Sequence, residues 1–139
     1  MRVVIAFFIT PGDKGPGMPI YGGIGNRSFE YVSVTDLYSK FLTQEIIIPH
    51  IERLYNMTDD TAHRALVGIS SGAVCSFNVA WHRLDVFGKV ICHSGKFVNI
   101  RGGSKFPELI CQTPAKPIKV FLQSGEKDLN ITFGSWAIK

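Results

Sequence analysis

Hydrophobic residues occur along this chain in short blocks that polar or glycine-rich stretches separate. The block at residues 3–9 is apolar throughout, without alternation, which predicts a strand buried on both faces of a parallel sheet. Apolar blocks at residues 65–69, 86–92 and 118–123 predict three further strands. Between the first block and the next lies a stretch, residues 10–26, that holds six glycines and three prolines. This composition predicts a long loop at the end of the first strand.

Two other stretches have the spacing of helices. Leu37, Phe41 and Ile48 are among the apolar residues that recur at helical intervals and predict a helix over residues 36–55. Pro49 lies inside it and lacks a backbone donor, so we expect a kink or break near residues 44–46. Small residues followed by larger packing groups predict a second helix over residues 71–83.

The order of these elements indicates the fold class. The stretch 3–69 predicts a right-handed strand–helix–strand unit, and the later strands continue the alternation through a glycine-rich, polar crossover at residues 99–104. We therefore expect an α/β fold, a three-layer sandwich in which helices cover both faces of a mainly parallel sheet. The length of 139 residues and the 45% hydrophobic content fit a single domain over residues 1–139.

Charge and cysteine content narrow the function classes. Fifteen basic and eleven acidic residues give a net charge of +4, but the basic residues are scattered and do not alternate with aromatic ones. We expect no nucleic-acid partner and, since no apolar run approaches the ~20 residues of a membrane span, no membrane partner. Cys75, Cys92 and Cys111 lack metal-site spacing and are interpreted as buried, inert thiols. No leader is recognisable, so localisation stays open, with the cytoplasm as the default.

The sequence Gly68-Ile69-Ser70-Ser71-Gly72 lies between a predicted strand and a predicted helix. That is the G-x-S-x-G pattern of a nucleophile elbow, in which a tight turn needs small residues on both sides and raises the serine above the sheet. Ser70 is the predicted nucleophile, and the Ser71 backbone N–H is a predicted oxyanion donor. The alternative is a serine- and glycine-rich helix cap without catalysis.

Two more strand ends carry candidate residues, because functional groups collect at the carboxyl ends of parallel strands. Asp128 follows the strand at 118–123 and is the candidate triad acid, with Glu126 in reserve and a solvated loop carboxylate as the alternative. His93 follows the strand at 86–92 and is a candidate pocket residue, with a structural role favoured over a catalytic one because it precedes the acid in the chain.

All four histidines precede Asp128, whereas the histidine of an elbow-type triad follows the acid. In an enzyme of this kind, a second oxyanion N–H would come from a loop after a strand that precedes the first predicted strand, residues 3–9. We therefore expect a fragment of a longer domain whose activity on its own is weak or lacking.

These motifs resemble the putative esterase family, of the enterochelin-esterase-like or esterase-D-like group in the α/β-hydrolase superfamily. The resemblance covers about residues 3–136 and also rests on Asn26-Arg27-Ser28 with Glu30-Tyr31, on residues 87–95, on residues 99–103 and on residues 120–128. It implies a partial α/β-hydrolase fold and a serine carboxylic-ester hydrolase with Ser70 as nucleophile and Asp128 as acid. It further implies a small-molecule ester as partner and neither a metal nor an organic cofactor.

Some positions differ from the family pattern. Ala73, Leu84 and Ser124 stand where members often have glycine, proline and aspartate, which should affect packing or the pocket more than the reaction. Arg27, Glu30 and Tyr31 are expected in the loop approaching the site, where Arg27 and Glu30 could pair to shape the pocket or form an ordinary loop ion pair.

Two other function classes stay open. One is a non-catalytic hydrolase relic that binds a ligand or partner, with bare sheet edges that favour association into oligomers. The other, a nucleotide-binding domain, is weak because residues 22–25 lack the strand–GxGxxG–helix register. The ester substrate itself cannot be inferred from these residues.

Overall fold

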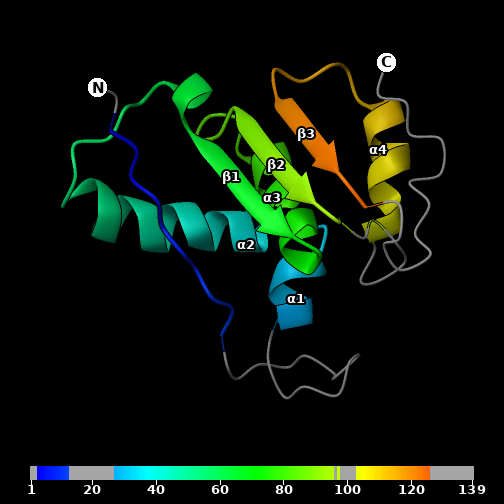
Figure 1. The fold of residues 1–139 in the computed structure, drawn as a ribbon, viewed down its shortest axis with the longest axis horizontal. Coiled ribbons are helices and arrows are strands. Elements are labelled where there is room, and N and C mark those ends of the chain that lie inside the picture. The colour runs from blue at the N-terminus through cyan, green and yellow to red at the C-terminus, as the bar shows by residue number, and fades with distance from the viewer. Residues whose placement is uncertain (1–2, 13–26, 96, 98–102, 126–139) are drawn as a thin grey trace.

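A computed structural model describes residues 3–12, 27–95, 97 and 103–125 of the chain. Its centre is a three-stranded sheet formed by β1 (Ala65–Ile69), β2 (Lys89–His93) and β3 (Lys119–Gln123). The strands lie in the order β1-β2-β3 and all pair in parallel, with Ile69 opposite His93 and His93 opposite Gln123. The predicted α/β class with a parallel sheet is therefore confirmed (Figure 1).

Three of the four predicted strands are present, and the largest shift is three residues at the start of one of them. The strand predicted over 86–92 forms only at Lys89–His93. Val86 and Phe87 instead donate their backbone N–H groups to the Arg83 carbonyl in a turn, so they leave no donors for the ladder.

Helices cover one face of this sheet. Helix α3 (Ser71–His82) connects β1 to β2 and lies behind the sheet in Figure 1. It packs against the strand residues that point to its side, among them Val90 and Cys92, which are buried. Its Ala73, Val74, Val79 and Ala80 are almost fully buried, and this interface is the centre of the hydrophobic core.

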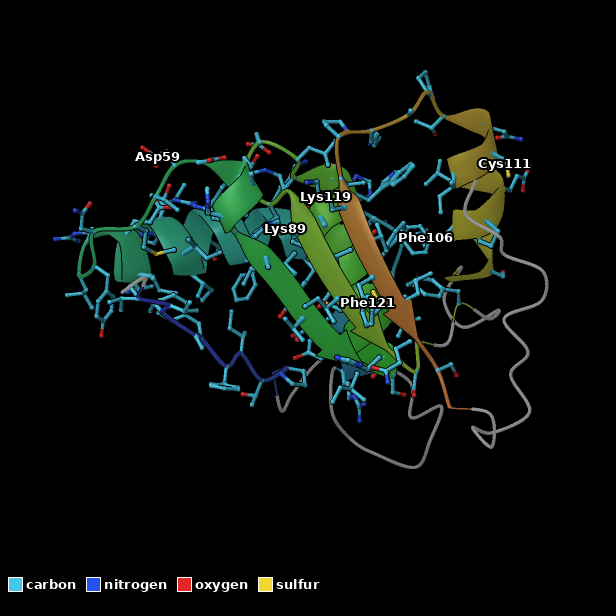
Figure 2. The ribbon with its side chains drawn as sticks, turned by 45° about the horizontal axis from the view of Figure 1, so that its top comes forward. Asp59, Lys89, Phe106, Cys111, Lys119 and Phe121 are labelled. Atoms are coloured by element: carbon cyan, nitrogen blue, oxygen red, sulfur yellow. The ribbon has the colours of Figure 1, made fainter. Side chains whose placement is uncertain are left out.

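The opposite face of the sheet is open in the described part of the chain. Val67, Ile69 and Phe121 point to it and are 61%, 68% and 55% exposed. Figure 2 shows Lys89 and Phe121 on this face with no helix drawn over them. The described residues thus form two layers, the sheet and the helices on one of its faces. The third layer that was expected would need a helix on the open face, and none of the described helices packs there.

Residues 3–12 are the largest departure from the prediction. The apolar run at 3–9 does not form a strand, and Val3, Val4 and Phe8 are 83%, 86% and 95% exposed. A strand needs a neighbouring edge to satisfy its backbone groups, and none of the described strands pairs with this segment. The predicted strand–helix–strand unit over 3–69 is therefore wrong, and β1-α3-β2 is the unit observed.

The helix predicted over 36–55 is present in a different form. Its first turn is α2 (Leu37–Lys40), and it continues as a π-helix, η1 (Phe41–Glu52), with Pro49 inside. Proline lacks an N–H and collides with the carbonyl four residues earlier in an α-helix, and a wider turn is one way to accommodate it. The change of geometry begins at Phe41, earlier than the break expected near residues 44–46.

Four short helices had no counterpart in the prediction. They are α1 (Arg27–Val32), the 3-10 helices η2 (Thr61–His63) and η3 (Gly103–Lys105), and α4 (Phe106–Gln112). Helix α4 begins with Phe106 and Pro107, a favoured position for proline. Phe106 is 1% exposed, and its ring lies 5.2 Å from that of Phe77 in α3. Among the described helices, none has the length and apolar character that crossing a bilayer requires.

Candidate active site

The carboxyl ends of the three strands lie at one edge of the sheet, and α1 lies beside that edge in Figure 1. Ser70 follows β1 and immediately precedes α3, at a corner with φ 56° and ψ −119°. Its N–H donates to the His93 carbonyl at 2.9 Å, and its own carbonyl accepts from the N–H groups of Ala73 and Val74. The corner is thus tied to β2 on one side and to the first turn of α3 on the other.

The Ser70 hydroxyl makes no capping hydrogen bond to α3. Serine before a helix ordinarily accepts a bond from an N–H of the first turn. Here the backbone carbonyl of Ser70 serves that turn instead, and the side chain is partly exposed. The helix-cap alternative is therefore not what the geometry favours.

The tightness of the corner comes from Gly68. A Cβ atom at Gly68 would lie 2.0 Å from the carbonyl oxygen of Gly72, so the close approach of these two residues is confirmed. Gly72 is different, because a Cβ atom there would meet no described atom within 4 Å. The expectation that both glycines must be small is wrong for Gly72, whose backbone, and not its missing side chain, makes the contact.

Arg27 lies next to this corner. Its Nε and Nη2 atoms both donate to the Ser71 Oγ, at 2.9 Å and 2.6 Å. The contact joins the start of α1 to the start of α3, 44 residues apart. The pairing of Arg27 with Glu30 that the sequence suggested is absent from the ion pairs of the described residues.

Glu30 and Tyr31 of α1 contact the N-terminal segment. The Gly12 N–H donates to the Glu30 carboxylate, 3.1 Å from Oε2, and the Tyr31 hydroxyl donates to the Ile9 carbonyl at 2.9 Å. Burial, and next the nearby Cys75, raise the pKa of Tyr31, so its hydroxyl stays a donor at neutral pH. Through these bonds α1 links residues 9–12 to the corner at Ser70.

Cys75 lies one turn after Ser71 and is a second possible nucleophile by position. Burial, and then the Glu30 carboxylate, raise the pKa of its thiol to about 12. The reactive form of cysteine is the thiolate, and burial suppresses it here. Ser70 is therefore the better nucleophile candidate of the two.

His93 ends β2, and its ring belongs to the open face of the sheet. Its Nδ1 lies 2.8 Å from Oε1 of Gln123 at the end of β3. An amide oxygen only accepts, so this contact assigns the proton to Nδ1. The hydrogen bonds of the described residues link His93 to Ser70 through the backbone carbonyl and include none from the ring to the Ser70 hydroxyl.

Several predicted residues cannot be placed. Asp128, its reserve Glu126, and Asn26 lie outside the described residues. The structure therefore brings together Ser70, Ser71, Arg27 and the His93 backbone, and leaves the role of each as a prediction. Within the described ranges, His, Cys, Asp and Glu side chains form no cluster of three suited to a metal ion.

Sequence reasoning missed two contacts at this edge. The sequence indicates a role for Ser71 only through its backbone N–H and not its side chain, and it indicates Gln123 only as the end of a predicted strand and part of the family motif. Gln123 had a usable signal, since it ends a predicted strand beside His93 in a parallel sheet. The Arg27 contact had none, because residues 27 and 71 are joined only by the tertiary fold.

The fold and this edge define a parallel α/β protein with a serine at the corner between a strand and its following helix. The family model for Putative esterase matches residues 5–130, and the chain belongs to that family. Membership supports a hydrolase function of the esterase kind. No solved structure matches the chain.

Proposed function

We propose that this protein is a serine carboxylic-ester hydrolase that acts through an acyl-Ser70 intermediate. The observation that carries the proposal is the corner at Ser70, with positive φ, a hydroxyl that does not cap the helix and an adjacent helix start. This arrangement fits the nucleophile elbow, in which a strained turn presents the serine oxygen to substrate.

The start of α3 suits the charge that forms in the reaction. Attack of the Ser70 oxygen on the ester carbonyl gives a tetrahedral intermediate with an oxyanion. The Ser71 N–H belongs to the first turn of α3, where backbone donors have no acceptor within the helix and the helix dipole is positive. We assign this N–H as an oxyanion donor.

The hydroxyl proton passes to a general base, which in enzymes of this kind is a histidine held by a carboxylate. Asp128 follows β3 and is proposed for that carboxylate. The alcohol then leaves with a proton, and water attacks the acyl-Ser70 ester to release the acid and restore the hydroxyl. His93, Arg27, Glu30 and Tyr31 are proposed as pocket residues, and no cofactor enters these steps.

A fluorophosphonate probe tests the nucleophile directly, because it phosphonylates an activated serine. Ser70 should be the labelled residue, identified by mass spectrometry of the peptide. Ser70→Ala should abolish labelling. Ser94→Ala is the matched control, since Ser94 also has positive φ at the end of a neighbouring strand, and it should keep labelling.

Labelling that survives in Ser70→Ala would overturn the assignment. An unlabelled wild-type chain that still binds small esters would favour the alternative of a hydrolase relic that binds ligands without catalysis. Binding by an unlabelled chain is measured by equilibrium dialysis with 4-nitroacetanilide, the amide that corresponds to 4-nitrophenyl acetate and reacts far more slowly with a serine nucleophile.

A further inference from the structure

The guanidinium of Arg27 is held in one place at the predicted active site. Its Nε and Nη2 atoms converge on one acceptor, the Ser71 Oγ. The helix that carries it is fixed as well, because Glu30 binds the Gly12 N–H and Tyr31 binds the Ile9 carbonyl. A side chain bound at its tip and carried on a fixed helix is preorganised for a ligand.

The positive charge of Arg27 is not neutralised by the Ser71 hydroxyl that binds its side chain. Arg64 and Arg83 each lie within ion-pair distance of a carboxylate, at 2.8 Å from Glu52 and 2.8 Å from Asp85. Among the described ion pairs Arg27 has no such partner, and a serine hydroxyl carries no charge. Guanidinium has five N–H donors in a planar fork, so donors beyond those used on Ser71 can bind an anion.

The position of this cation is close to the proposed point of attack. Ser71 adjoins Ser70, and Nη2 is 2.6 Å from the Ser71 Oγ, which places Nη2 no more than roughly 9 Å from the Ser70 Cα. A carboxylate bound there would sit a few bonds away from an ester carbonyl attacked by Ser70. The positive N-terminal end of the α3 dipole also attracts such an anion.

We propose that Arg27 selects esters that carry a carboxylate a few bonds from the scissile carbonyl. This inference rests on the proposed esterase function and adds the class of substrate. Arg27 binds the carboxylate through a charge-assisted hydrogen bond, while Ser71 holds the guanidinium in place. A neutral ester of the same length lacks that contact and relies on apolar packing alone.

Kinetics with paired substrates test the selection. The 4-nitrophenyl monoester of adipic acid and 4-nitrophenyl hexanoate have acyl chains of equal length, and only the first carries a carboxylate. Arg27→Gln should lower kcat/KM for the adipate ester about tenfold to a hundredfold more than it lowers kcat/KM for the hexanoate. Arg53→Gln, which removes an exposed positive charge at the end of η1, is the matched control and should change neither.

A second pair locates the carboxylate on the acyl or the alcohol side. In 4-acetoxybenzoate the anion is on the leaving group, and its methyl ester is the neutral partner. An effect of Arg27→Gln on this pair, without an effect on the adipate pair, would place the anion on the alcohol side. Equal losses on charged and neutral esters in both pairs would overturn the proposal.

Binding without turnover separates this inference from the proposed function. Adipate added to the ¹⁵N-labelled chain should shift the NMR signals of the Arg27 Nε–H and the Ser71 N–H, whereas adipamide should not. Arg27→Gln should remove the Ser71 response, and Arg53→Gln should keep it. Loss of ester hydrolysis with adipate binding intact would refute the esterase alone, and no adipate response in the wild-type chain would refute the role of Arg27.

Discussion

Two neighbouring strands of this sheet end in almost the same way. Ser70 after β1 and Ser94 after β2 are the non-glycine residues with positive φ in the described part of the chain, at 56° and 48°. Each donates its N–H to the last residue of the next strand, Ser70 to the His93 carbonyl and Ser94 to the Gln123 carbonyl. The two corners therefore share their strain and their anchoring.

The two corners differ in the chain on either side of the serine. A helix starts directly after Ser70, whereas no helix begins at Ser94. Two residues before Ser70 is Gly68, where a Cβ atom would collide with the start of α3, and two residues before Ser94 is Cys92, whose side chain is buried without collision. Positive φ is thus a property of both strand ends, and the helix packed onto Gly68 is the feature that distinguishes the corner at Ser70.

The largest expected effect comes from Gly68→Ala. A methyl group 2.0 Å from the Gly72 oxygen must displace backbone, so we expect a loss of about 3 kcal/mol or more in the free energy of unfolding. Gly72→Ala is the matched control at the other end of the same contact. It meets open space and favours the helix, so it should be neutral or gain up to about 1 kcal/mol.

Urea unfolding followed by circular dichroism measures both variants. Equal stability of Gly68→Ala and Gly72→Ala would show that the corner is not as tight as the structure has it. The difference between the two corners would then reduce to the helix alone.

A smaller effect is expected from Ser70→Gly and Ser94→Gly, which remove the strain of positive φ. Such strain costs about 1–3 kcal/mol, and part of the gain is offset by the larger unfolded-state entropy of glycine. Each variant should raise the free energy of unfolding by about 1 kcal/mol. A gain at Ser94 without one at Ser70 would mean that the helix start, and not the turn, sets the backbone at Ser70.

The smallest effect concerns the thiols near the two corners. Burial raises the pKa of the Cys92 thiol, two residues before Ser94, to about 12. Burial is also the main cause that raises the pKa of the Cys75 thiol in α3 to about 12. At pH 8 iodoacetamide should therefore modify the exposed Cys111 and leave these two intact, as mass spectrometry would show. Rapid alkylation of Cys92 in the folded chain would indicate that the second corner opens.

Because the pKa values of these two buried thiols are raised, the free energy of unfolding should depend on pH. A folded pKa of about 12 lies above the unfolded value of about 8.5, so the unfolded chain loses these protons first as pH rises. Stability from this source is complete below about pH 8.5 and is lost between about pH 9 and 12. The urea midpoint should fall in that window, and less steeply in Cys92→Ala, whereas an identical slope would exclude this source.

Elements with strong local signals were predictable. β1 and β3 combine apolar side chains with polar flanks, and α3 follows small residues that pack closely onto the sheet, so all three match the prediction within a residue or so. The corner at Ser70 was also visible, since glycine at position 68 is the residue that the close approach demands.

The failures have two causes. Residues 3–9 have the composition of a strand but no paired edge among the described strands, and Phe41–Glu52 has helical spacing but takes a wider turn around Pro49. Helix α4 was not predicted, because it follows a glycine-rich stretch that suggested a crossover. Its Phe106 packs on Phe77 of α3. For residues 3–9 and α4 a contact distant in the sequence, or its lack, outweighed local preference, whereas at Phe41–Glu52 the cause, Pro49, lies within the segment.

For the site, local chemistry placed a serine between a buried strand and a helix and required a glycine two residues before it. That much follows from the sequence, because turn geometry depends on neighbouring residues alone. The contact of Arg27 with Ser71, the link of Ser70 to the His93 carbonyl and the open second face of the sheet depend on which distant segments pack together. Only the tertiary structure decides these, since packing selects partners by shape and burial over the whole chain.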